Sequence, residues 1–311
     1  MSTAYFTHPD CRRHDMGDGH PECPQRLDAI EDWLIGNGLD VALERHQAGP
    51  VQFSDVELAH SRRYVVEISE LLQRCAADGE PRAVDPDTVV GRHTWAAALH
   101  AAGAAVAATD LVLDGKAENA FCAVRPPGHH ATRDAAMGFC FFNNVAIAAR
   151  HALDVRGLMR VAIVDFDVHH GNGTEDIIAN DDRVLMVSLF QHPLYPYSGA
   201  VPQGENMVNV PMPAYTRGPA AREMIEAMWL PALERFAPEM IFVSAGFDAH
   251  RDDDLGQMGL VEADYTWITE QVVAVAARHS QGRIVSCLEG GYNLPALARS
   301  VGAHLRVLAG V

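Results

Sequence analysis

Short apolar runs alternate with longer helical patterns along most of the chain. The apolar runs are rich in β-branched residues and predict strands at residues 4–7, 120–124, 160–166, 183–189, 240–245 and 283–288. The segments between them have helical patterns, at residues 24–35, 62–77, 94–113, 143–153, 219–236, 262–279 and 294–308. Strands that alternate with helices are typical of a parallel sheet covered by helices. We therefore expect an α/β fold with a central, mainly parallel sheet.

The chain shows no internal repeat, low-complexity tract or long polar linker, so we expect a single domain over residues 1–311. The alanine-rich segment 95–108 resembles a membrane or dimerisation helix in composition. Asp110, Asp114 and the loop signals around them favour a helix packed against the sheet instead. No run reaches about 18 uninterrupted apolar residues and no leader pattern opens the chain, so neither membrane spanning nor export is expected.

Charge and cysteine content narrow the function classes. The chain has 24 basic and 41 acidic residues, a formal net charge of −17, which argues against direct nucleic-acid binding. An acidic surface attracts cationic partners, although most such surfaces only improve solubility. The six cysteines form no CxxC pair and no dense framework, so we interpret them as reduced thiols of a cytoplasmic protein.

The segment VAIVDFDVHHGNGT at 161–174 carries the strongest chemical signal. Asp165, Asp167 and His169 occur at every second position, and alternate side chains of a strand point to the same side. A strand this apolar is covered on both faces, so these polar groups need partners. Asp248 ends another predicted strand and supplies a third ligand beside Asp167 and His169. One histidine and two carboxylates suit catalytic zinc, although the same ligand set also binds iron, cobalt or manganese.

Two further groups follow predicted strands. His129 and His130 follow residues 120–124 after a four-residue RPPG segment, and Tyr292 follows residues 283–288 beyond two glycines. Ligands of open α/β sheets bind at the carboxyl ends of strands, so these groups are expected beside the metal ligands. Asp165 is placed to orient one imidazole, and the phenol of Tyr292 is a suitable donor to an oxyanion.

The chain resembles the zinc-dependent histone deacetylase superfamily in six blocks that occur in the expected order. They are HPECPQR at 20–26, RPPGHHA at 125–131, GFCFFNN at 138–144, VDFDVHHGNGT at 164–174, SAGFDAH at 244–250 and LEGGYN at 288–293. The RPPG sequence, and Asn172 where class I enzymes carry aspartate, place the resemblance in the branch of class II enzymes and bacterial acetylpolyamine amidohydrolases.

The resemblance implies an arginase/deacetylase fold: one three-layer domain with about eight strands flanked by helices. It implies one zinc ion held by Asp167, His169 and Asp248. His129 would pair with Asp165, and His130 would face Asn172 and act as the main base and acid. Tyr292 and the zinc ion would stabilise the oxyanion formed when water attacks the amide.

The resemblance also implies a narrow substrate channel and a second ion. Channel residues would be Gly138, Phe139, Tyr195, Leu255, Gly290 and Gly291, with Asp85 or Asp87 at the rim. A structural potassium ion would lie near Asp165, Asp167, His169, Ser188 and Leu189, and Arg26 matches a buried arginine of the internal cavity. The chain departs from the family at residues 196–199, PYSG instead of the common PGTG. It also departs at Leu255, where eukaryotic polyamine deacetylases carry a glutamate.

The leading hypothesis is a zinc amidohydrolase that removes acetyl or related short acyl groups from lysine side chains. The alternatives are an acetylpolyamine or small-amide deacetylase, and a catalytically silent acyl-ligand sensor or interaction module. An arginase-type manganese ureohydrolase is disfavoured because the further aspartates of a binuclear cluster are missing. The expected partner is an acylated lysine protein or an acylated polyamine, with no nucleic acid or membrane, and homo-oligomerisation stays open.

Overall fold

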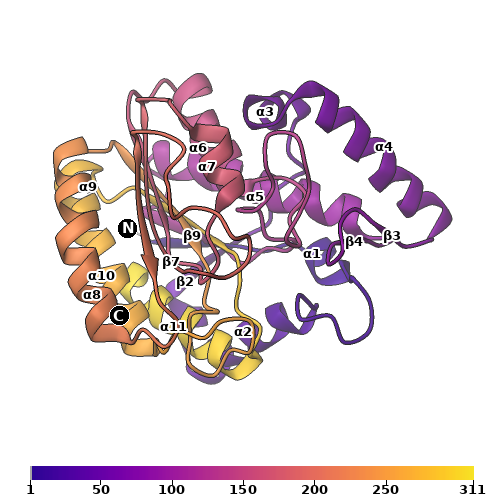
Figure 1. Ribbon diagram of the computed structural model, residues 1–311. Coiled ribbons are helices and arrows are strands. Elements are labelled where there is room, and N and C mark those ends of the chain that lie inside the picture. Colours follow the sequence, from indigo (N-terminus) through magenta and orange to yellow (C-terminus); the bar gives the residue numbers. More distant parts are fainter. Residues whose placement is uncertain (1) are drawn as a thin grey trace.

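The computed structural model describes residues 2–311 and contains an eight-stranded, wholly parallel sheet (Figure 1). The strand order is β2-β1-β5-β10-β9-β6-β7-β8. The strands are β1 (Thr3–Phe6), β2 (Leu43–His46), β5 (Asn119–Cys122), β6 (Val161–Asp165), β7 (Val184–Gln191), β8 (Met207–Met212), β9 (Met240–Ala245) and β10 (Ile284–Leu288). A separate antiparallel pair joins β3 (Arg82–Ala83) and β4 (Val89–Val90). The α/β fold with a parallel sheet is therefore confirmed.

Helices cover the sheet on two sides (Figure 1). One side carries α2 (Gln25–Gly36), α8 (Gly218–Met224), α9 (Leu230–Phe236), α10 (Glu262–His279) and α11 (Leu294–Ala309). The other carries α3 (Phe53–Ala59), α4 (Arg62–Asp78), α5 (Thr94–Leu113), α6 (Asn144–Arg150) and α7 (Asn172–Ile178). Short turns of helix complete the chain: α1 (Pro9–Arg13), the 3₁₀ turn η1 (Asp40–Ala42) and the π-helical turns η2 (His151–Val155) and η3 (Ile225–Trp229).

All six expected strands form, and the two strands of the eight-stranded sheet that the pattern did not predict, β2 and β8, are its edges. The short pair β3 and β4 was not predicted either. Edge strands need no apolar residues on both faces. β2 is largely polar, and β8 contains the exposed Pro211, which lacks an N–H group and is tolerated mainly at a sheet edge. The helix expected over residues 219–236 is divided by η3 just before Pro231, because proline cannot donate an α-helical hydrogen bond.

The alanine-rich segment forms α5, which packs on β1, β5 and β10. By length and composition alone α5 could cross a membrane, but 56% of its most apolar 18-residue stretch is buried inside the protein. Small alanine side chains let the helix approach the sheet closely. The packed position of this segment agrees with the sequence prediction.

The loops that carry the sequence motifs leave the sheet at one edge. β5, β10, β9 and β6 are consecutive neighbours in the sheet, and all run in the same direction. Parallel strands present their carboxyl ends together, which is where ligands of such sheets bind. The segments 125–131, 166–174, 246–259 and 289–293 are thereby brought to one place.

Candidate active site

Asp167, His169 and Asp248 present three donor atoms that all lie within 4.8 Å of one another. His169 Nδ1 is 3.1 Å from Asp167 Oδ1 and 3.0 Å from Asp248 Oδ2. Both carboxylates are buried. Burial, and then repulsion by the charge of Asp167, raise the pKa of Asp248 to about 7. A divalent cation between them would remove that repulsion, so nitrogen and oxygen donors here fit a metal ion such as zinc.

The surrounding backbone holds the two carboxylates in place. Gly290 N donates to Asp167 Oδ2 at 2.8 Å, and Val168 N donates to Asp248 Oδ1 at 2.9 Å. A Cβ atom on Gly290 would lie 2.1 Å from Asp248 Oδ2. Glycine is therefore required at this position for the β10 loop to approach the donor atoms so closely.

His129 and His130 lie beside this group, with ring centroids 4.0 Å apart. Each ring has a different partner. His129 Nδ1 donates to Asp165 Oδ2 at 3.1 Å, whereas His130 Nδ1 donates to Asn172 Oδ1 at 2.7 Å. The His130 ring is also 6.0 Å from the ring of His169. Both pairings implied by the resemblance are present in the structure.

The different partners give the two histidines opposite charge preferences. Burial disfavours protonation of His129, but the carboxylates of Asp167 and Asp165 outweigh it and raise the pKa to about 10. At His130, burial together with the charges of His129 and His169 lowers the pKa well below the ordinary value. His130 is therefore neutral, with a proton on Nδ1 and a free lone pair on Nε2.

Tyr292 is placed by contacts that the sequence did not reveal. Asp253 Oδ2 accepts from Tyr292 N at 2.6 Å and from Asn293 N at 2.9 Å. The guanidinium carbon of Arg26 lies 5.0 Å from the centroid of the Tyr292 ring. Burial and the charge of Asp248 raise the pKa of Tyr292 well above its usual value, so the hydroxyl retains its proton and can donate.

Phe139 and Tyr195 lie beside different members of the candidate site. The ring of Phe139 is 5.9 Å from that of Tyr292, and the ring of Tyr195 is 5.2 Å from that of His130. Phe139 has a positive φ of 69°, a conformation that costs free energy for any residue except glycine. Thr88 Oγ1 accepts from Phe139 N at 2.9 Å and thereby holds it in this conformation.

The remaining predicted channel residues lie on the loops around these aromatic rings. Asp85 Oδ2 accepts from Gly138 N at 3.3 Å, so Asp85 supports the Phe139 loop. Gly291 O accepts from Arg26 Nε at 2.7 Å. Leu255 is half-buried, and its amide donates to Asp253 Oδ1 at 3.1 Å, which links it to the turn of Tyr292.

The residues of the expected potassium site come from two neighbouring strands: Asp165 ends β6, and Ser188 and Leu189 lie within β7. Ser188 on β7 pairs in register with Asp165 on β6, and Asp167 and His169 follow directly. Ser188 and Leu189 are both buried. The carbonyl of Ser188 accepts from Trp229 Nε1 at 3.3 Å.

Glu289 is a buried residue that sequence reasoning missed. Its Oε2 accepts from Gly128 N at 2.7 Å and from His129 N at 3.1 Å, and its Oε1 accepts from Ser244 Oγ at 3.1 Å. Through these hydrogen bonds Glu289 connects the loop after β10 to the loop after β5, which carries the histidine pair. The available signal was an acidic residue directly after an apolar strand, within the LEGGYN block.

A second cluster of potential metal donors lies outside these sequence motifs. It consists of the half-buried residues His8, Asp10 and His100. The rings of His8 and His100 stack with centroids 3.5 Å apart and an interplanar angle of 10°. Imidazole binds metals in the ring plane, so nearly parallel stacked rings cannot both aim at one ion. This cluster is better explained by the ion-pairing of Asp10.

Glu22, Arg26 and Arg125 form a buried cluster of charges. Glu22 is fully buried and accepts from Arg125 Nη2 at 2.7 Å and Arg26 Nη1 at 3.0 Å. Replacing Glu22 with glutamine would leave two buried guanidinium groups without a counter-charge. We expect Glu22→Gln to lower the free energy of unfolding by about 3–5 kcal/mol, measured by urea denaturation. Glu57→Gln, which removes an exposed pair with Arg62, is the control and should change it by less than about 1 kcal/mol. Equal effects of both variants would contradict the assignment.

Comparison with known proteins agrees with this geometry. A family model described as "Histone deacetylase domain" matches residues 20–308. The histone deacetylase-like amidohydrolase of Pseudomonas aeruginosa is 39% identical over 282 residues, covering 88% of this chain and 73% of that protein. The human polyamine deacetylase HDAC10 is 35% identical over 329 residues, covering 100% of this chain and 48% of that protein.

A solved structure extends the likeness to three dimensions. The crystal structure of the HDA15 HD domain superposes with a TM-score of 0.92 at 32% identity, covering 99% of this chain and 88% of that one. The family model, the relatives and the fold agree over nearly the whole length. The chain therefore belongs to the histone deacetylase family, whose members are hydrolases that act on amide bonds.

Proposed function

We propose that this protein is a zinc-dependent deacetylase that removes acetyl or related short acyl groups from lysine side chains. The observation that carries the proposal is the grouping of the Asp167, His169 and Asp248 donors with His130, whose ring lies 6.0 Å from that of His169 and donates to Asn172. Tyr292, whose phenol keeps its proton, lies in the same group of loops. Amide hydrolysis needs an activated water, a polarised carbonyl and a proton for the leaving amine. The proposed residues supply groups for each of these needs.

The donor set fits zinc. Asp167, His169 and Asp248 offer one imidazole nitrogen and two carboxylate oxygens, which is three protein ligands and leaves a position open. A zinc ion held there would polarise the substrate carbonyl and acidify a water molecule. Gly290 N and Val168 N, which donate to the two carboxylates, would keep the ligands oriented when the ion is exchanged.

His130 is proposed as the base and acid. Its Nδ1 proton is held by the amide oxygen of Asn172, so Nε2 is free to accept a proton from the attacking water. The oxygen of that water bonds to the carbonyl carbon, and Nε2 then returns the proton to the lysine nitrogen as the C–N bond breaks. His129, held by Asp165, would stay charged and stabilise the developing negative charge.

Tyr292 is proposed as the donor to the oxyanion. Its hydroxyl retains its proton, and Asp253 fixes the backbone of its turn. Hydrogen-bond donors aimed at the developing oxyanion are commonly the largest single contribution of a side chain to such reactions. Phe139, beside Tyr292, and Tyr195, beside His130, would form the walls of a channel for the aliphatic lysine side chain.

Lysine is preferred to polyamine as the substrate because of Leu255. A free polyamine carries ammonium groups, and an apolar leucine on the channel loop offers them no counter-charge. The similarity to a human polyamine deacetylase keeps acetylpolyamine as the second candidate.

We also propose a structural potassium ion beside Asp165, Asp167, His169, Ser188 and Leu189. The six unpaired cysteines support a cytoplasmic location.

The test compares substrates under matched conditions. Zinc-loaded protein is assayed with an acetyl-lysine peptide, longer acyl-lysine peptides and N-acetylputrescine, with His130→Ala as the variant. We expect kcat/KM for the peptide to exceed that for N-acetylputrescine at least tenfold and to fall about 10²–10⁴-fold in His130→Ala. A preference for N-acetylputrescine would support the polyamine alternative. Tight hydroxamate binding without hydrolysis of any substrate would support a silent sensor.

A further inference from the structure

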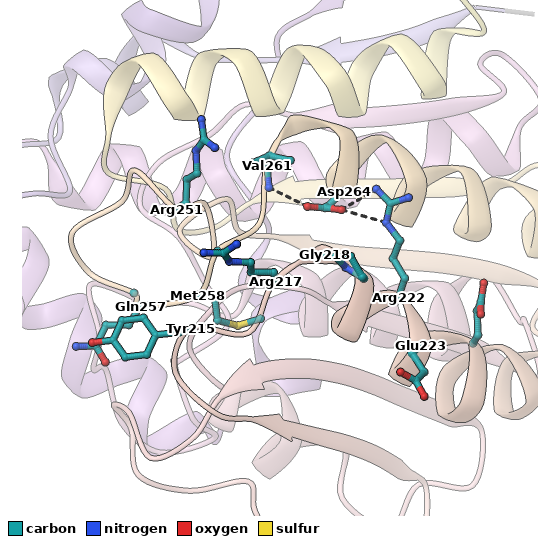
Figure 2. Close-up of a pocket in the computed structure, with 14 residues that line it drawn as sticks. Tyr215, Arg217, Gly218, Arg222, Glu223, Arg251, Gln257, Met258, Val261 and Asp264 are labelled. Atoms are coloured by element: carbon teal, nitrogen blue, oxygen red, sulfur yellow. Dashed lines mark hydrogen bonds and ion pairs between the residues drawn. The ribbon is translucent and has the colours of Figure 1, made fainter.

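A cleft of about 930 Å³ lies outside the catalytic group, between the β8–α8 loop and the β9–α10 loop (Figure 2). Tyr215, Arg217 and Gly218 line one wall, and Arg251 and the segment 256–259 line the other. Both loops leave the carboxyl ends of parallel strands, so the cleft opens near the edge of the sheet that carries the proposed catalytic residues. None of the roles described above uses this cleft.

The charges along the cleft are unevenly distributed. Arg222 is neutralised by Asp264, to which its Nη2 donates at 2.6 Å, and Glu223 and Glu226 lie beside it on α8 and η3. At the other end, Arg251 approaches only its neighbour Asp252, at 3.6 Å, and within residues 2–311 Arg217 has no ion-pair partner. In a protein with a net charge of −17, this end presents two guanidinium groups available to an anion.

Arg217 is positioned by backbone contacts and not by an acidic side chain. It forms a parallel bridge with Gly259, and a Cβ atom at Gly259 would lie 3.2 Å from Arg217 Cγ. The aliphatic part of Arg217 therefore packs over the glycine. Figure 2 shows the guanidinium group of Arg217 in the cleft, on the same side as Arg251. An arginine whose stem is already packed loses less conformational freedom when it binds a carboxylate.

One loop separates this cationic end from the proposed metal centre. Gly256 lies against Val168, the residue between Asp167 and His169, so closely that a Cβ atom would come within 2.8 Å of Val168 Cγ2. The next residue, Gln257, accepts from Tyr215 N at 2.7 Å. Tyr215 is 76% exposed despite a φ of 66°, a conformation unfavourable for tyrosine. The β8–α8 loop thus presents an exposed aromatic ring and Arg217, and the β9–α10 loop presents Arg251, beside the proposed catalytic residues.

We propose that the Arg217–Arg251 end of this cleft binds an acidic side chain in the polypeptide that carries the acyl-lysine. This inference rests on the proposed lysine deacetylase function and deepens it. A carboxylate can accept two parallel hydrogen bonds from an arginine, and the ring of Tyr215 provides a surface for the adjoining peptide backbone. A free polyamine would be repelled by both guanidinium groups. The cleft therefore selects protein substrates with aspartate or glutamate a few residues from the acyl-lysine.

The experiment is a peptide scan with matched variants. Acetyl-lysine peptides carry a single aspartate, asparagine or lysine at each of several positions on either side, and acetyl-lysine without flanking residues is the reference. Arg217→Gln, Arg251→Gln and the double variant are compared with the unaltered protein. Arg74→Gln, an exposed arginine on α4, is the control for loss of one positive charge.

We expect aspartate at one or two positions to lower KM about threefold to tenfold relative to asparagine, with kcat unchanged. The double variant should lose this advantage, Arg74→Gln should keep it, and higher ionic strength should reduce it. Turnover of flank-free acetyl-lysine should be the same in all variants. An advantage that persists in the double variant, or equal KM for aspartate and asparagine peptides, would overturn the cleft assignment and leave the proposed function intact. Hydrolysis of N-acetylputrescine with no hydrolysis of any peptide would overturn both.

Discussion

Replacing Asp248 with asparagine is expected to remove zinc binding and to reduce deacetylase activity by about three orders of magnitude or more. Asp248 Oδ2 lies 3.0 Å from His169 Nδ1, and its other oxygen accepts from Val168 N. An asparagine keeps the size of the side chain but loses the charge that balances a divalent cation. Metal content after dialysis, measured by mass spectrometry, and hydrolysis of an acetyl-lysine peptide together test this expectation.

Asp254→Asn is the matched control for Asp248→Asn. Asp254 is exposed and lies on the same loop, so its replacement removes the same charge without touching the donor group. It should retain one zinc ion per chain and near-normal turnover. Full zinc occupancy in Asp248→Asn would contradict the proposed ligand set, and treatment of the unaltered protein with a chelator should reproduce the loss of activity.

Tyr292→Phe is expected to lower kcat about 10²–10³-fold with little change in KM or zinc content. The substitution removes only the hydroxyl, whose proton is retained because burial and Asp248 raise the pKa of the phenol. The ring of phenylalanine can still lie beside Phe139 and Arg26. A loss confined to kcat would therefore identify an interaction made in the transition state.

Tyr197→Phe is the control for Tyr292→Phe. Tyr197 is 76% exposed on the loop that follows Tyr195, and removal of its hydroxyl should leave kcat unchanged. Near-normal kcat in Tyr292→Phe would contradict the role as oxyanion donor. A loss of zinc in that variant would show instead that Tyr292 acts through the metal centre.

The elements that were predictable are those with a local signature. The central strands β5, β6, β9 and β10 are apolar on both faces because both are covered, and every one of them appeared in the sequence pattern. The edge strands β2 and β8 were missed because a strand with one neighbour tolerates polar residues and proline. The division of the helix at η3 was missed because the pattern around Pro231 continues on both sides.

The same distinction applies to the candidate site. The period-two spacing of Asp165, Asp167 and His169 lies within one segment, so their grouping could be predicted before the fold was known. Asp253 and Glu289 were not predicted as parts of the site. Asp253 reaches Tyr292 across 39 residues, and Glu289 reaches Gly128 across 161 residues. No local pattern records such contacts.

The sequence by itself thus determined the α/β class, the parallel direction of the sheet and the types of side chain at the candidate site. These depend on side-chain alternation and on residue chemistry, which are local properties. The tertiary structure alone decided which strands are edges, which imidazole is neutral, how Asp253 holds Tyr292, and that Arg217 and Arg251 share a cleft. These features depend on burial and on contacts between distant segments, and both arise only when the chain is folded.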